Sequence, residues 1–214
     1  MEVKRTIRIR LLPNAIEETV LISTVNAYTD SLNEILQYGF ETGESNGVNL
    51  HHATYYNHRD KYKLPSELTG SARVRATEVL KAVKEFERKG KKVSCPSSKF
   101  CPIRYRYRSY SIWFDRLEVS LLTLEGRIKL PIKIPEFYRE YTTWKPASAD
   151  LIRDKKNRWW LHIVVSKDIP ISEPTEEVIG IDLGIVKPAT DSNGTFYGSD
   201  HWKVVEDRIF EHRR

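Results

Sequence analysis

The strongest candidate for chemistry in this chain is a carboxylate at the end of an apolar strand. Asp182 follows Val178, Ile179 and Ile181 and shortly precedes Gly184. This pattern predicts a strand anchored in a core, and a carboxylate at its end can hold a hard divalent cation. Gly184 leaves room for backbone or substrate to approach closely. Asp182 is therefore our candidate catalytic residue and metal ligand, suited to a centre in which metals clamp the oxygens of a phosphodiester.

Two other interpretations of this pattern stay open. Sugar kinases and actin-like ATPases place a similar strand and Asp–Gly turn against phosphates, and an ordinary strand can end in an Asp turn without any function. The kinase and ATPase interpretation is disfavoured, because in actin-like enzymes the motif opens the chain. Here it follows most of the sequence.

A second distinctive stretch, residues 71–108, is strongly basic. Residues 104–108 read Arg-Tyr-Arg-Tyr-Arg, which in an extended chain places three guanidiniums on one face and the tyrosines on the other. Arginine pairs with phosphate through two hydrogen bonds, and tyrosine stacks on unpaired bases. The alternative is a solvated helix face followed by a strand whose tyrosines lie in the core. The candidate nucleic-acid-binding residues are Lys91, Lys92, Lys99, Arg104, Arg106 and Arg108.

Composition is compatible with these expectations without deciding them. The 214 residues are 40% hydrophobic and 30% charged, with a net charge of +6, which leans modestly towards an anionic partner. No apolar run approaches the ~18 residues that span a bilayer, and the N-terminus has no signal-like core. We therefore expect no membrane partner and a cytoplasmic location.

The cysteines and histidines invite a metal site, but their spacing argues against one. Cys95 and Cys101 lack a second ligand pair, so we expect two free thiols in a reducing compartment. His51 and His52 are adjacent and cannot share a helix face with each other. With His58, they are interpreted as a polar helix end.

The elements that must position these residues follow from periodicity and turn signals. Alternation predicts a strand over 3–12, and helical spacing predicts helices over 15–40, 50–57 and 65–87. Asn14 can cap the first helix. Strands are expected over 109–114, 117–122, 126–134, 149–153 and 158–167. A proline-containing linker at 168–176 precedes a strand over 177–182 and a hairpin around 192–194.

The segment Gly180-Ile-Asp182-Leu-Gly184, then Ala189-Thr190 and Ser192-Asn193-Gly194, resembles the first RuvC motif of the TnpB (OrfB) proteins of insertion sequences. These proteins are relatives of the type V CRISPR effector nucleases. The segments that begin at Ser109, Gly126 and Arg158 look like the family's wedge-domain strands.

The resemblance implies an α+β fold in which a β-barrel-like wedge domain is split by a helical insertion and followed by the first strands of an RNase H-like (RuvC) domain. The wedge domain would cover 1–12 and 93–167, the recognition insertion 13–92, the linker 168–176 and the RuvC-like start 177–214. The implied function is a transposon-associated, RNA-guided DNA endonuclease. Its partners would be guide RNA and target DNA, and its cofactor Mg²⁺.

The family's second and third acidic motifs and zinc ribbon lie further downstream than this sequence extends. Glu206 and Asp207 lie too close to Asp182 to replace the second motif. We therefore expect a truncated form that binds Mg²⁺ weakly or not at all and does not cleave alone. A lone strand and hairpin would also expose apolar edges. The alternative function is a non-catalytic RNA- or DNA-binding remnant or repressor.

Overall fold

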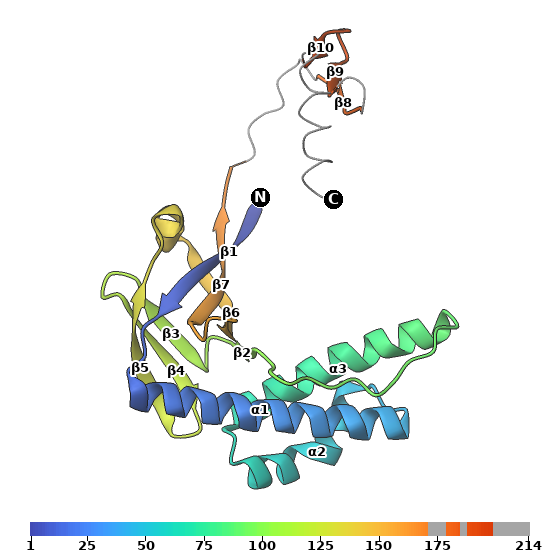
Figure 1. The fold of residues 1–214 in the computed structure, drawn as a ribbon, viewed down its shortest axis with the longest axis vertical. Helices are drawn as coiled ribbons and strands as arrows, with labels where there is room; N and C mark the ends of the chain where they lie inside the picture. Colours follow the sequence, from blue (N-terminus) through green and yellow to red (C-terminus); the bar gives the residue numbers. More distant parts are fainter. Residues whose placement is uncertain (171–178, 185–187, 199–214) are drawn as a thin grey trace. The chain divides into compact units, whose positions relative to one another are not determined.

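The computed structural model describes residues 1–170, 179–184 and 188–198. The chain divides into two compact units, Met1–Ile169 and Pro170–Arg214 (Figure 1). Among the described residues, the first unit is a mixed α+β fold with three α-helices, one 3-10 helix and a nearly closed antiparallel sheet. None of the helices in these ranges is long and apolar enough to cross a lipid bilayer.

The sheet has seven strands in the order β2-β6-β7-β1-β5-β4-β3. Their bounds are β1 Glu2–Leu11, β2 Ile103–Tyr105, β3 Tyr110–Trp113, β4 Glu118–Thr123, β5 Gly126–Lys133, β6 Lys145–Arg153 and β7 Trp159–Asp168. The expected strands are confirmed, and β6 begins earlier than expected because a bulge between Pro146 and Ala149 lets its first residues pair with β7.

A turn at 106–109 joins the two edge strands, β2 and β3, and brings the ends of the sheet together. Two tyrosines from these strands hold the junction. The hydroxyl of Tyr105 donates to the carbonyl oxygen of Leu122 at 3.0 Å, and that of Tyr110 donates to the carbonyl oxygen of Ala147 at 2.9 Å. The first bond ties β2 to β4 and the second ties β3 to β6, so both cross the junction between the two ends of the sheet.

The three helices, α1 Ala15–Thr42, α2 Gly47–Tyr62 and α3 Ser66–Arg88, lie in the chain between β1 and β2. The 3-10 helix η1, Glu136–Thr143, follows β5. As expected, Asn14 caps α1: its side-chain oxygen accepts the N–H groups of Ile16 and Glu17, and the Glu17 carboxylate accepts the N–H of Asn14. The second helix is longer than expected because Asn46 caps it at Val48.

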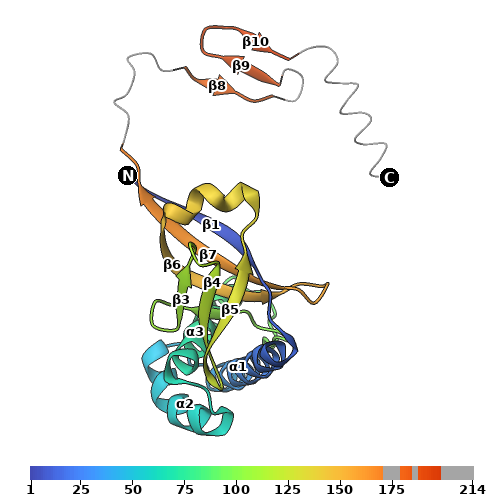
Figure 2. The same cartoon turned by 90° about the vertical axis from the view of Figure 1, so that its left-hand side faces the viewer.

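Helices and strands share one hydrophobic core, and Figure 2 shows the strands curled over the helices. Alternation along β1 buries Ile7, Ile9 and Leu11, as the sequence predicted. A buried chain of hydrogen bonds links α1, α3 and β2: the Tyr28 hydroxyl lies 3.1 Å from Ser71 Oγ, which donates to the Arg104 carbonyl oxygen at 2.7 Å. These bonds therefore fix the position of α1 and α3 against the edge strand β2.

The second unit contains, among its described residues, strands β8 Ile181–Asp182, β9 Ala189–Asp191 and β10 Phe196–Tyr197 in the order β10-β9-β8. The hairpin expected around 192–194 is confirmed. The expectation that Ile179 and Ile181 anchor their strand in a core is wrong, because these side chains are 55% and 63% exposed. Among the described residues of this unit, these short strands form a single layer. Val178 and the segment 199–214 lie outside the described residues.

Candidate nucleic-acid interface

The run from Arg104 to Arg108 does not form one extended segment, so the expectation of three guanidiniums on one face is wrong. Strand β2 ends at Tyr105, and the chain turns. The Arg106 carbonyl oxygen accepts the N–H groups of Ser109 and Tyr110, and the Arg106 N–H donates to Ser109 Oγ at 2.8 Å. The turn is required because β2 and β3 are the two edges that the fold brings together.

The two tyrosines of this run have opposite environments. Tyr105 is fully buried, and burial raises the pKa of its hydroxyl far above the ordinary value. Tyr107 is 75% exposed, with the Arg108 guanidinium 5.4 Å from its ring centre. The core interpretation therefore holds for Tyr105, whereas only Tyr107 is available to stack on a base.

Arg104 belongs to a network of ion pairs between β2, β6 and α3. Its guanidinium lies 2.7 Å from a Glu78 oxygen and 3.7 Å from Asp150, which also pairs with Arg75 at 3.2 Å. The hydrogen bond to Glu78 raises the pKa of Arg104. Much of the Arg104 charge is therefore compensated within the protein.

Arg106 and Arg108 are exposed and form no ion pair within the described ranges. The predicted lysines are exposed as well, but the structure places them elsewhere. Lys91 and Lys92 follow the C-terminal end of α3, which lies far from β2 (Figure 1). At 1.5 Å per residue, this helix is ~34 Å long. The structure therefore does not bring these two lysines together with the arginines.

Lys99 is also separate from the turn arginines. It lies on a segment that runs along α1: the Ser98 N–H donates to Asn33 at 2.8 Å, and the Cys101 N–H donates to Thr29 Oγ1 at 3.0 Å. The roles of Lys91, Lys92 and Lys99 in binding stay predictions.

The register of the sheet assembles a basic surface that sequence reasoning missed. Across β2, β6, β7 and β1, Arg104 pairs with Asp150, Asp150 with His162, and His162 with Arg8. Their chain neighbours on either side are buried, so these four side chains share the outer face of the sheet. Burial and the adjacent Arg8 lower the pKa of His162.

The next row on this face is Ile152, Trp160, Arg10 and Lys133. We call Arg104, Arg8, Arg10 and Lys133 the basic band. Arg8 and Lys133 are exposed, and no ion pair joins either of them to a carboxylate in the described part of the chain. The alternating basic residues of β1 are the sequence feature that could have indicated this surface. Which residues lie beside them on the neighbouring strands follows only from the register of the sheet.

Trp160 lies within the band but is no open surface for base stacking. The guanidiniums of Arg10 and Arg158 each lie 5.5 Å from its ring centre, and its Nε1 donates to Asp154 at 3.0 Å. The tryptophan therefore packs against Arg10 of the band and against Arg158 beside it, and phosphate contact is the chemistry that the band offers.

Asp182, the candidate catalytic residue, is exposed on β8 and pairs with Thr190. The nearby carboxylate of Asp191 does not join it. Ile181 is the residue that pairs with Asp191, so the side chains of Asp182 and Asp191 project from opposite faces. Asp191 accepts hydrogen bonds from the N–H groups of Thr195 and Asn193 and from the Tyr197 hydroxyl, which lower its pKa.

The described ranges contain no group of three or more His, Cys, Asp or Glu side chains that could hold a metal. The free thiols are confirmed, with Cys95 exposed and Cys101 buried. The expectation of a polar helix end is wrong for His58, which is 2% exposed with Nδ1 3.0 Å from Ser31 Oγ. Helix α2 continues to Tyr62, so His58 lies inside the helix and not at its end. Its ring faces Ser31 of α1.

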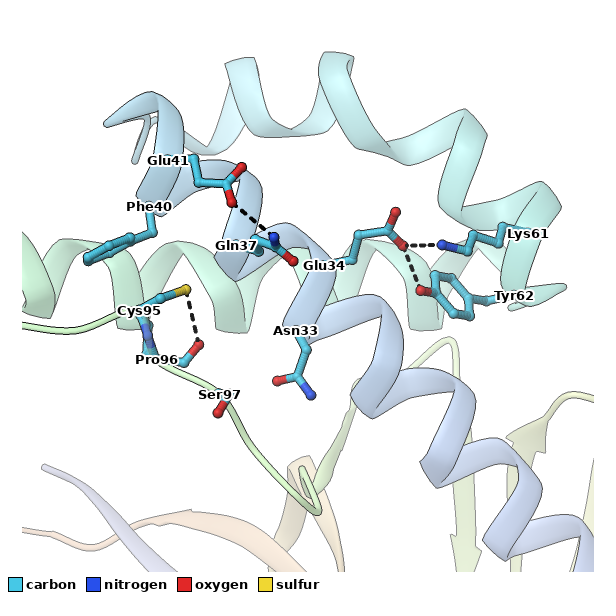
Figure 3. Close-up of a pocket in the computed structure, with 10 residues that line it drawn as sticks. All are labelled: Asn33, Glu34, Gln37, Phe40, Glu41, Lys61, Tyr62, Cys95, Pro96 and Ser97. Atoms are coloured by element: carbon cyan, nitrogen blue, oxygen red, sulfur yellow. Dashed lines mark hydrogen bonds and ion pairs between the residues drawn. The ribbon is translucent and has the colours of Figure 1, made fainter.

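A cavity of about 660 Å³ lies between α1, the end of α2 and residues 95–97 (Figure 3). Its lining includes Glu34 and Glu41. Glu34 accepts a hydrogen bond from the Tyr62 hydroxyl at 2.6 Å and one from Lys61 at 2.9 Å, and these hold its pKa below the ordinary value. Two carboxylates disfavour a phosphate backbone here, despite the size of the cavity.

Comparison with known proteins does not assign the chain to a family. No protein-family model matches the chain, and a search of curated proteins finds no similar sequence.

Proposed function

We propose that this chain binds nucleic acid through the basic band, with a sugar–phosphate backbone crossing the sheet between β2 and β1. The observation that supports this is a row across four strands, with Arg104 of β2 and Arg8 of β1 at its ends and Asp150 and His162 between them, beside the adjoining row that contains Arg10 and Lys133. Strands hold these side chains at fixed spacing, and the planar guanidinium matches phosphate geometry. Arg8 and Lys133 contribute charge that no internal carboxylate neutralises within the described ranges.

We further propose that this binding surface belongs to a TnpB-type, transposon-associated, RNA-guided DNA endonuclease. The element order supports it: β1, then the helical block, then the remaining strands. This is the order that the sequence resemblance implies for a wedge domain split by a helical insertion. The RNase H-like continuation, guide RNA, target DNA and Mg²⁺ are parts of this proposal, and Asp182 would be the first metal ligand.

A non-catalytic nucleic-acid binder is the second candidate. The surroundings of Asp182 favour it, because the side chain of the nearby Asp191 projects from the opposite face of the sheet. Asp191 instead accepts the backbone N–H groups of Asn193 and Thr195 in the turn that follows it. RNA that copurifies with the chain can be sequenced. The protein is then incubated with this RNA, a DNA that matches its sequence and Mg²⁺, and the DNA is examined for cuts. Specific cuts that disappear in Asp182→Ala would support the nuclease and overturn the expectation that this chain does not cleave alone. RNA binding without cuts fits both candidates, and the genomic sequence after the codon for Arg214 then separates them, since a continuation with further acidic motifs and cysteine pairs supports the nuclease.

Removing two free cations of the band is expected to weaken binding and its dependence on salt. The double variant Arg8→Ala/Lys133→Ala should lower affinity for single-stranded RNA. The slope of log affinity against log salt should become shallower by about 1.4, at ~0.7 per lost phosphate contact. Fluorescence anisotropy of a labelled oligonucleotide at several salt concentrations measures both.

The matched control removes the same charge from Lys81 of α3 and from Lys89, which directly follows the helix, and both side chains are exposed. Lys81→Ala/Lys89→Ala should leave the slope nearly unchanged. An equal effect of the two double variants would mean that binding follows total charge, and the band would then have no special role. An unchanged slope in the band variant would refute the proposed surface directly.

A further inference from the structure

A cavity of about 290 Å³ lies where the end of β2 meets α2 and α3. Arg104 and Arg106 line it from β2 and the turn, Arg73 from α3, and His51 and Tyr55 from α2. Arg104 also belongs to the basic band, so the cavity opens beside one end of that band. The sequence brings none of these three elements together, because they lie far apart along the chain.

Arg73 is a partly buried cation without a carboxylate partner among the described residues. Its Nε is buried and has no hydrogen-bond partner, and no carboxylate pairs with its guanidinium among the described residues. Burial and the neighbouring Arg106 lower its pKa. Its Nη1 lies 2.8 Å from the position that a Cβ on Gly47 would occupy, so the guanidinium is packed against the first residue of α2.

His51 adds a second unsatisfied polar group to the same cavity. Its Nδ1 is buried without a hydrogen-bond partner. Burial, followed by the nearby Arg73, lowers the pKa of His51. The ring stacks on Tyr55, with ring centres 4.4 Å apart and planes 30° from parallel. Buried polar groups normally find partners. The Arg73 Nε–H is a donor that lacks an acceptor, whereas His51 Nδ1 lacks a donor or an acceptor according to the tautomer of the ring.

The charges around the cavity favour an anion as that acceptor. Glu67 is the carboxylate among the lining residues, and no ion pair joins it to Arg73 or Arg106 within the described ranges. Glu78 is committed to Arg104. Arg73 and Arg106 therefore repel each other across the cavity with little internal compensation.

We propose that this cavity binds a phosphate group of a nucleic-acid strand, held between Arg73 and Arg106. Two guanidinium forks match the several acceptor oxygens of a phosphate. The cavity is larger than a phosphate alone requires, and Tyr55 offers an apolar wall for the adjoining sugar. The strand as the source of the phosphate rests on the proposed function, whereas the phosphate chemistry of the cavity is independent of it.

The test uses Arg73→Gln, which removes the charge and keeps a polar side chain, with Lys81→Gln on the exposed part of the same helix as control. Inorganic phosphate should raise the melting temperature of the wild type and of the control but not of Arg73→Gln. Affinity for a labelled single-stranded RNA should fall roughly ten-fold in Arg73→Gln, as expected for one lost charge-assisted contact. The control should bind like the wild type.

Stability without ligand separates a binding role from a structural one. Arg73→Gln should melt no lower than the wild type without phosphate, because it removes an uncompensated, partly buried charge. A clearly lower melting temperature would identify Arg73 as a structural residue and overturn the proposal. Arg73→Lys, which keeps the charge, should recover part of the phosphate effect.

The remaining outcomes distinguish the cavity from the band. If phosphate has no effect on the wild type and RNA affinity is unchanged in Arg73→Gln, the cavity proposal fails, while RNA loss in Arg8→Ala/Lys133→Ala still supports the band. If Arg73→Gln abolishes the phosphate effect but not RNA affinity, the cavity takes free phosphate and the nucleic-acid source is refuted. If the wild type binds no nucleic acid, the proposed function fails and the phosphate arm alone decides the cavity.

Discussion

Replacing Tyr105 with alanine is expected to lower the free energy of unfolding by about 3–5 kcal/mol, the usual cost of removing a fully buried aromatic side chain. The ring lies in the core at the end of β2, where its hydroxyl donates to the Leu122 carbonyl oxygen of β4. The variant therefore opens a cavity and also removes a bond that joins edge strand β2 to β4 across the junction between the two ends of the sheet.

Tyr107→Ala is the matched control, two residues further along and 75% exposed. It should change the free energy of unfolding by less than about 0.5 kcal/mol, as is usual for surface substitutions. Urea unfolding followed by circular dichroism measures both variants. Comparable losses from the two would contradict the assignment of Tyr105 to the core and Tyr107 to the surface. Tyr105→Phe should retain most of the stability, since only the hydrogen bond is lost.

Removing the Asp154 carboxylate is expected to destabilise the β6–β7 hairpin and to alter how stability responds to acid. One carboxylate oxygen accepts the backbone N–H groups of Lys156 and Arg158, each at 2.9 Å. The other accepts Arg158 Nε at 2.7 Å and Trp160 Nε1 at 3.0 Å. Partial burial alone would raise the pKa of Asp154, but these hydrogen bonds outweigh it and hold the pKa well below its ordinary value.

The sign of the pH effect follows from this lowered pKa. The unfolded chain takes up the proton more readily than the folded protein, so ionised Asp154 stabilises the fold. That contribution is complete above about pH 4, the ordinary pKa of an aspartate. It is lost as the pH falls further, towards the pKa of the folded state.

Melting temperatures between pH 7 and pH 2 measure this prediction. Asp154→Asn should melt lower than the wild type at pH 7, and the difference should shrink as the pH falls below 4. Asp30→Asn is the control, since Asp30 is exposed on α1 without a hydrogen bond or ion pair in the described residues. A difference between Asp154→Asn and the wild type that stays constant down to pH 2 would rule out the carboxylate as the cause.

Much of the fold was predictable from local pattern. Alternation placed β1 with Ile7, Ile9 and Leu11 inward, and the cap at Asn14 marked the start of α1. The hairpin residues 154–157 and 192–194 marked turns that the structure contains. These features depend on residues within a few positions of one another, so the sequence states them directly.

The candidate site was predictable only in part. Residue type alone named Arg104, Arg106 and Arg108 alike as candidates. The structure separates them, because the charge of Arg104 is compensated by Glu78, whereas Arg106 and Arg108 form no ion pair among the described residues. It did not reveal the pairing of Arg8 with His162, or the meeting of Arg73 with Arg106. Asp182 stays a prediction, since the described residues supply no second ligand beside it.

The sequence by itself determined the order and kind of most elements, the inward face of β1, the basic character of residues 71–108 and the motif around Asp182. Only the tertiary structure decided which charges are neutralised and which remain free. The physical reason is that period-2 alternation states the face on which a side chain lies but not its neighbour across the sheet. Those neighbours come from strands and helices far apart in the chain, and their charges determine whether an arginine stabilises the fold or is left to bind a ligand.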